Sequence, residues 1–210
     1  MTLEKDSYHT ISQPTDEVLY KEKNSKFFGY AFPIQTEEEV KDILDNIKKR
    51  HYNARHWCYA FQIGTEQPYY RANDDGEPSN TAGMPIYGQI QSFDVTNILI
   101  IVVRYFGGIK LGVGGLITAY KATAQMTMEN ANIIEKTIDK QFKIRFEYKD
   151  MNNVMRVIKE RNLKIIQQKM EMNCEIELSI RKSEYPQALE AFIPFYEIRV
   201  IKSDRKNSSQ

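Results

Sequence analysis

Apolar and polar positions in the first half of the chain predict alternating strands and helices. Residues 17–32 are typical of a hairpin that turns near Asn24. Residues 36–50 predict a helix, because Thr36 and Glu39 form a capping box ahead of apolar residues at helical spacing. We also expect strands at 57–63 and 68–72, a helix at 81–93, a strand buried on both faces at 97–106, and a helix from Leu116 to about Asn130.

The second half has a cleaner pattern. Alternation predicts strands at 142–148, 163–170, 173–180 and 196–202, and helices at 150–161 and 183–193. We expect Asp150 and Ser183 to cap these helices. The order β-α-β-β-α-β is that of ferredoxin-like folds. The predicted fold class is therefore α+β, with one domain at 1–137, a ferredoxin-like domain at 138–203, and a disordered tail at 204–210.

Composition is that of a soluble globular protein. The 210 residues are 41% hydrophobic, and no apolar run approaches the roughly 20 residues that span a bilayer. The N-terminus lacks the apolar segment of a secretory signal, and Cys58 and Cys174 are far apart, so we expect reduced thiols and a cytoplasmic protein with no membrane partner. The net charge is +1, and the modest basic excess of residues 138–210 permits contact with nucleic acid without requiring it.

Glycines concentrate between a buried strand and a helix. Glycine allows positive φ and close backbone approach, and the N-terminus of a helix attracts anions, so the segment is compatible with a phosphate cradle. It matches neither a Walker loop nor a dinucleotide fingerprint, and a purely structural turn is an equal alternative. The candidate anion-binding residues are Arg104, Gly107, Gly108, Lys110, Gly112, Gly114, Gly115 and Lys121.

The polar loop "NDDGEPSN" is the second segment in which candidate functional residues are concentrated. Asp74, Asp75 and Glu77 are suitable ligands for a hard cation, but a solvated turn followed by a capped helix is the favoured interpretation. With His56, these carboxylates are candidates for the cleft wall opposite the glycines. We expect His51 and His56 to be surface or capping residues, and no metal, cofactor or catalytic residue is assigned.

Four segments, "ARHWCYAF", "DDGEPSNTAGMPI", "VVRYFGGIKLGVGGL" and "AYKA", together resemble the signature of the IMPACT/YigZ family over about residues 17–130. The resemblance implies an N-terminal two-layer α/β domain like domain 2 of ribosomal protein S5. It also implies a ferredoxin-like C-terminal domain similar to the last domain of elongation factor G. Trp57 departs from the family pattern, in which a second polar residue follows the histidine, and this argues against chemistry by a histidine pair.

Eukaryotic members of the family act in translational control, so the resemblance implies a related role. We expect a non-enzymatic, translation-associated regulatory or binding protein that contacts RNA, the ribosome or a translation factor, without DNA sequence specificity. The alternative is an enzyme or sensor that acts on a small phosphorylated or nucleotide ligand at the glycine loop. The candidate RNA contacts are Lys143, Arg145, Lys149, Arg156 and Lys159.

Overall fold

The computed structural model describes residues 6–202, so the tail expected at 204–210 lies outside the described residues. The chain divides into two compact units, 8–136 and 137–202, and the second unit also includes residues 6 and 7. The domain limits 1–137 and 138–203 remain a prediction about independent folding. No helix in the described part of the chain is both long and apolar enough to cross a membrane.

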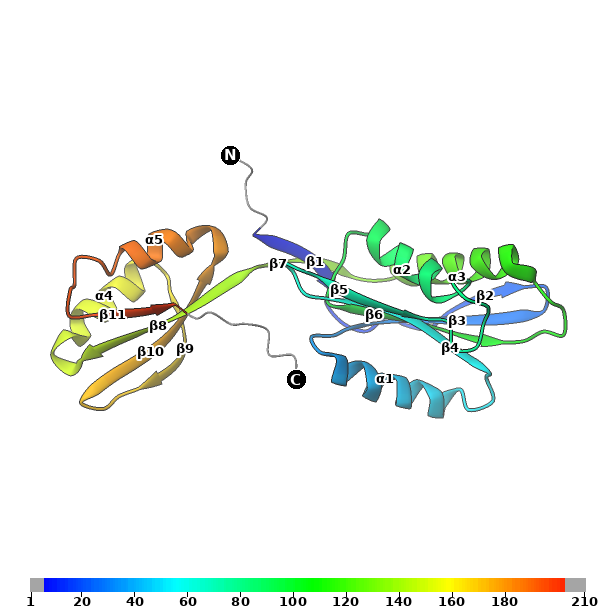
Figure 1. Ribbon diagram of the computed structural model, residues 1–210, viewed down its shortest axis with the longest axis horizontal. Helices are drawn as coiled ribbons and strands as arrows, with labels where there is room; N and C mark the ends of the chain where they lie inside the picture. Colours follow the sequence, from blue (N-terminus) through cyan, green and yellow to red (C-terminus); the bar gives the residue numbers. More distant parts are fainter. Residues whose placement is uncertain (1–5, 203–210) are drawn as a thin grey trace. The chain divides into compact units, whose positions relative to one another are not determined.

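An antiparallel five-stranded sheet forms the centre of the N-terminal unit (Figure 1). The expected hairpin is present, and its turn residues Lys23 and Asn24 have positive φ. The spatial order is β2-β3-β6-β4-β5, which places the most apolar strand of the chain in the middle. The strands are β2 (Val18–Glu22), β3 (Ser25–Pro33), β4 (His56–Ile63), β5 (Tyr69–Asn73) and β6 (Ile98–Tyr105).

Helices cover both faces of this sheet (Figure 1). Leu99, Ile101 and Val103 of β6 pack with α1 (Glu37–Arg50), whereas the alternate residues pack with α2 (Gly83–Ser92) and α3 (Gly112–Glu129). The domain therefore has three layers, and the expected two-layer arrangement is wrong. The reason lies in β6 itself, because a strand that is apolar on both faces needs a cover on each.

The structure also shows how the helices of this unit begin. Thr36 caps α1 by accepting a hydrogen bond from the Glu39 backbone N–H, as expected, whereas the Glu39 carboxylate reaches one residue further back to the N–H of Gln35. The glycine-rich segment is partly helical, since α3 begins at Gly112 and not at Leu116. Glycine has a low helix propensity, so the glycines at the start of α3 made the predicted helix begin too late.

Two strands had no clear signal in the sequence. β1 (Ser7–Ile11) and β7 (Ile133–Thr137) pair to form a small separate sheet. Backbone and side-chain bonds from β1 to Thr96 and Asn97 attach this sheet to the segment that precedes β6. Pairing between segments more than 100 residues apart leaves little local pattern to detect.

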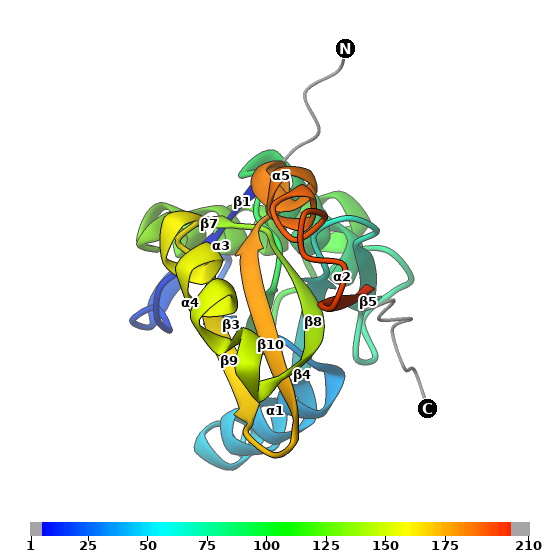
Figure 2. The same cartoon turned by 90° about the vertical axis from the view of Figure 1, so that its left-hand side faces the viewer.

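The C-terminal unit has the β-α-β-β-α-β order expected of it. Its sheet has the spatial order β11-β8-β10-β9, and Figure 2 shows β8, β10 and β9 side by side. Asp150 occupies the N-cap position of α4, as expected, but its side chain makes no capping hydrogen bond. Ser183 lies inside a 3₁₀ turn, and Glu184 takes the N-cap position of α5 instead. The elements are β8 (Asp139–Glu147), α4 (Met151–Glu160), β9 (Lys164–Lys169), β10 (Asn173–Arg181), α5 (Tyr185–Glu190) and β11 (Arg199–Lys202).

His51 ends α1 as its C-cap, and its ring is buried beside the sheet and not on the surface. Its Nε2 lies 2.5 Å from the hydroxyl of Tyr30, and its Nδ1 lies 3.1 Å from the hydroxyl of Tyr105. Tyr30 donates to the carboxylate of Glu17, which also accepts a hydrogen bond from Arg50. Burial lowers the pKa of His51, and the Arg50 charge adds to this effect while Glu17 opposes it.

This burial predicts a loss of stability on acidification. The pKa of His51 in the folded protein is below the ordinary value of about 6.5 for histidine, so the unfolded chain takes up the proton first as the pH falls. The free energy of unfolding should therefore decrease below about pH 6.5. Urea unfolding at about pH 7.5 and about pH 5.5 should show a larger loss for the parent than for His51→Gln. An equal loss in both proteins would contradict the assignment to His51.

Candidate functional site

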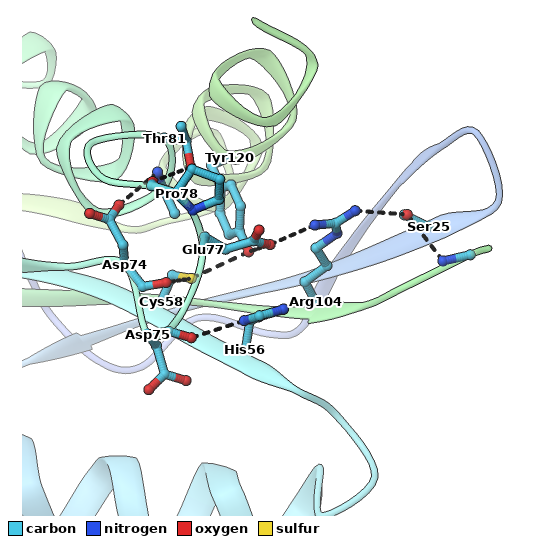
Figure 3. A network of polar contacts seen from close by, with 12 residues as sticks. Ser25, His56, Cys58, Asp74, Asp75, Glu77, Pro78, Thr81, Arg104 and Tyr120 are labelled. Atoms are coloured by element: carbon cyan, nitrogen blue, oxygen red, sulfur yellow. Dashed lines mark hydrogen bonds and ion pairs between the residues drawn. The ribbon is translucent and has the colours of Figure 1, made fainter. Parts of the chain in front are cut away.

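The polar loop between β5 and α2, residues 74–82, is fixed by its own carboxylates (Figure 3). Asp74 Oδ1 accepts hydrogen bonds from the backbone N–H groups of Ala82 and Gly83 at 2.9 and 2.8 Å, and its Oδ2 accepts one from Asn80. These bonds satisfy free donors at the start of α2, whose adjacent N-cap residue is an alanine without a side-chain acceptor. Asp74 therefore caps α2 from a distance.

Asp75 holds the same loop against β4. Its Oδ2 accepts a hydrogen bond of 2.7 Å from the backbone N–H of Trp57, and its backbone carbonyl lies 2.9 Å from Nδ1 of His56. His56 is therefore engaged with the loop backbone, and no carboxylate of residues 6–202 orients it as a general base.

The third carboxylate forms a buried ion pair with β6. Glu77 Oε1 lies 2.7 Å from Nη1 of Arg104, and the two side chains are 5% and 6% exposed. Tyr120 of α3 donates a hydrogen bond of 2.8 Å to the same oxygen, and Figure 3 shows Glu77 between Arg104 and Tyr120. The guanidinium also lies over the rings of Phe27 and Phe106, each 5.5 Å from its centre.

Cys58 of β4 completes this network. Its thiol is within hydrogen-bond range of the Asp74 carbonyl at 3.0 Å and of the Tyr120 hydroxyl at 3.3 Å. Burial raises the pKa of both Cys58 and Tyr120 well above their ordinary values. Both groups are therefore neutral at physiological pH, and neither is an activated nucleophile or base.

This geometry changes the roles that the sequence indicated. Arg104 was expected to add free positive charge to the glycine loop, but Glu77 neutralises it. Asp74, Asp75 and Glu77 were candidates for a cleft wall, and their carboxylates instead bind backbone N–H groups and an arginine within the fold. In residues 6–202 no three His, Cys, Asp or Glu side chains are grouped as metal ligands.

The glycines have separable structural roles. A Cβ at Gly107 would lie 2.1–2.3 Å from backbone atoms of Asn24 and Ser25, so this residue permits close contact with the β2–β3 turn. Gly108 and Gly112 have φ of +84° and +73°, and a Cβ at Gly115 would lie 3.0 Å from Leu111. Only Gly114 of the five has neither a positive φ nor a close neighbour, so the turn explains most of this loop.

The two candidate lysines are in different places. Lys110 is exposed in the loop before α3, whereas Lys121 lies on the outer side of α3 in a groove shared with α2. Arg104 is internally paired, whereas Lys110 remains an exposed cation within the glycine loop itself.

The candidate RNA contacts lie on different faces of the C-terminal unit. Lys143 and Arg145 project from the sheet face opposite α4 and α5, and both pair with Glu175. Lys149, in the turn before α4, pairs with Glu147. Arg156 and Lys159 are exposed on α4 and have no ion pair within residues 6–202. A single flat contact surface therefore does not include all five residues.

Sequence reasoning missed three members of the N-terminal network. Tyr120 and Cys58 lie inside the signature segments "AYKA" and "ARHWCYAF", but nothing local shows that they face the acidic loop. Ser25 accepts hydrogen bonds from Gly107 and Arg104, and its sequence surroundings give no signal for this role.

Removing the Glu77 charge should be costly, because it leaves a buried guanidinium without its carboxylate. We expect Glu77→Gln to lower the free energy of unfolding by about 3 kcal/mol. Tyr120→Phe removes only one hydrogen bond to the same oxygen and should cost about 1 kcal/mol. Urea denaturation of both variants measures the difference, and equal losses would show that the ion pair has no special role.

The structural roles assigned to Gly107 and Gly114 predict opposite effects of alanine substitution on stability. Gly107→Ala should destabilise the protein by several kcal/mol, because its Cβ meets backbone that cannot move aside. Gly114→Ala adds a Cβ in open space within a helix and should stabilise by up to about 1 kcal/mol. Thermal melting of the two variants should therefore shift in opposite directions. A tolerated Gly107→Ala would disprove the close-contact explanation.

Comparison with known proteins places this fold among relatives. The family model described as the Impact N-terminal domain matches residues 23–128. The IMPACT family member YvyE of Bacillus subtilis is 32% identical over 85% of this chain and 82% of its own length. YigZ of Escherichia coli, also described as an IMPACT family member, is 30% identical over 71% of this chain and 74% of its own.

A solved structure supports the arrangement of elements. A crystal structure described as that of a hypothetical protein superposes with a TM-score of 0.74 at 24% identity, covering 96% of this chain and all of that one. At this identity the similarity concerns the fold alone. The signature segments that resembled the family contribute Cys58, Asp74, Glu77, Arg104 and Tyr120 to one buried network. With the family model and the two relatives, this evidence shows that the chain belongs to the IMPACT family.

Proposed function

We propose that this protein is a non-enzymatic, translation-associated binding protein that contacts RNA, the ribosome or a translation factor. The translational role follows from the resemblance to eukaryotic family members. One observation carries the binding role: the chemically versatile residues of the signature segments are used inside the fold. Glu77 and Arg104 neutralise each other, Asp74 caps α2, and Cys58 is a buried neutral thiol.

An enzyme or sensor of small phosphorylated ligands is not favoured. Such a site needs a free base, a metal or a cationic cradle in reach of the ligand. At the glycine loop, Arg104 is occupied by Glu77, and two of the three loop carboxylates bind backbone N–H groups. Lys110 is the one lysine within the loop itself, residues 107–115.

Exposed cations are the groups left for an electrostatic contact with RNA. On the C-terminal sheet, Glu175 partly neutralises Lys143 and Arg145, so their attraction for phosphate is reduced. On α4, Arg156 and Lys159 carry no such partner among the described residues. We therefore place the stronger RNA contact on α4. No aromatic side chain lies on the open face of the described sheet strands, so base stacking there is not part of the proposal.

A salt titration of the full-length protein with fluorescent single-stranded RNA tests this assignment. Binding should be weak, should tolerate changes of sequence, and should fall with salt, since each phosphate contact releases counterions. The double variant Arg156→Gln/Lys159→Gln should reduce the log–log salt slope by roughly 1.4, the value for two phosphate contacts on a single strand.

The matched control is Lys143→Gln/Arg145→Gln, which removes the same charge from the sheet face. It should change the slope less, because those cations already pair with Glu175. Absence of binding at low salt, or binding indifferent to salt, would reject RNA as the partner. Equal effects of the two double variants would reject α4 as the contact.

A further inference from the structure

A groove of about 510 Å³ runs between α2 and α3 on the outer side of the N-terminal unit. From α2 it is lined by Pro85, Gly88, Gln89 and Ser92, and from α3 by Ile117, Lys121 and Gln125, with Phe93 at one end. Ile117, Lys121 and Gln125 recur every four residues and so form one stripe along α3. The lined part of each helix is about 10–12 Å long, or two helical turns.

Gly88 lies in the middle of α2 without a structural reason inside the fold. A Cβ at this position would meet nothing within 4 Å, and its φ is not positive. Glycine costs a helix interior up to about 1 kcal/mol relative to alanine. Because Gly88 has no side chain, the groove stays open at this position and the backbone of another segment can approach α2 closely.

A buried polar group also faces this groove. Gln89 is 6% exposed, and its Oε1 accepts a hydrogen bond from Ser92. No hydrogen bond from its Nε2 is found within residues 6–202, yet this nitrogen is not one of the fully enclosed polar atoms that lack a partner. Solvent therefore reaches the Gln89 amide, and its Nε2 can donate to an oxygen of whatever occupies the groove.

Apolar surface and charge define the kind of occupant. Ile117 is 38% exposed, Met84 one residue before the groove is 39% exposed, and Val113 one turn before Ile117 is 60% exposed. Of the described residues that line the groove, Lys121 is charged and none is acidic. A partly apolar groove that carries one cation complements a helix that has an apolar stripe flanked by carboxylates.

We propose that the α2–α3 groove docks an acidic amphipathic helix of a protein partner. Apolar side chains of that helix cover Ile117, Met84 and Val113, while its backbone passes over Gly88. A carboxylate of the helix pairs with Lys121. The inference rests on the proposed binding role and names one kind of protein partner for it. Its test contains no RNA in the primary measurement, so it can fail independently of the RNA contact.

Three fluorescent 14-residue helical peptides serve as probes. They share leucines at i, i+3, i+4 and i+7 and carry Glu, Gln or Lys at the other positions. Fluorescence anisotropy with the full-length protein should show binding of the Glu peptide with a Kd on the order of 10 µM, weaker binding of the Gln peptide, and least of the Lys peptide. NMR chemical shifts should place the bound peptide along α2 and α3.

Two variants test the geometry. Gly88→Gln fills the groove without an internal clash and should weaken the Glu peptide about tenfold or more. Lys121→Glu should reverse the preference toward the Lys peptide. The matched controls Asn46→Gln and Lys41→Glu, on exposed positions of α1 across the sheet, should change neither affinity nor preference. Melting temperatures no lower than that of the parent would establish that every variant is folded.

Several results would overturn the proposal. These are no binding of the Glu peptide, equal binding of the Glu and Lys peptides, or binding that Gly88→Gln leaves unchanged. Displacement of the bound peptide by single-stranded RNA, lost in Lys121→Glu, would assign the groove to nucleic acid and reject a protein helix as its occupant.

Discussion

The buried ion pair between Glu77 and Arg104 is the interaction on which the N-terminal unit depends. Arg104 lies near the end of β6, the central strand of the sheet, and is 5% exposed. Its guanidinium stays protonated even when it is buried. Desolvation of a guanidinium costs several kcal/mol, so the fold must bring a carboxylate to it. Glu77 meets that need and fixes the loop over β4 and β6. The pair thus specifies where the loop lies more than it adds net stability.

Local patterns predicted much of the fold, and distant pairings account for most of what they missed. The stripe and cap of α1, the apolar run of β6 and the alternation of β8 and β10 each belong to one short segment, and all of these elements formed as expected. The pairing of β1 with β7 depends on residues more than 100 positions apart. The two-layer expectation came from the family resemblance and not from a local pattern, because the predicted burial of β6 on both faces already required a cover on each.

For the candidate site, the sequence indicated the right segments but not the roles of their residues. A carboxylate that binds a metal, one that caps a helix and one that pairs with arginine look alike in a sequence. Only the structure distinguishes the roles of Asp74 and Glu77. Asp74 accepts hydrogen bonds from backbone N–H groups at the start of α2, and Glu77 contacts Arg104 and Tyr120. Similarly, the glycine loop was compatible with an anion cradle or a structural turn, and the structure gives Gly107 a structural role through its contact with the Asn24 backbone.

The hydrogen bonds of the loop at residues 74–82 also determine the geometry of the α2–α3 groove. Asp74 fixes the first turn of α2, and Glu77 three residues later accepts a hydrogen bond from Tyr120 in the neighbouring helix α3. One short loop therefore sets the position of both helices that form the groove walls. A preformed groove loses less conformational entropy on binding than a mobile one. The polar residues of the signature segments can thus serve recognition without touching a ligand, by holding α2 and α3 apart at a defined distance.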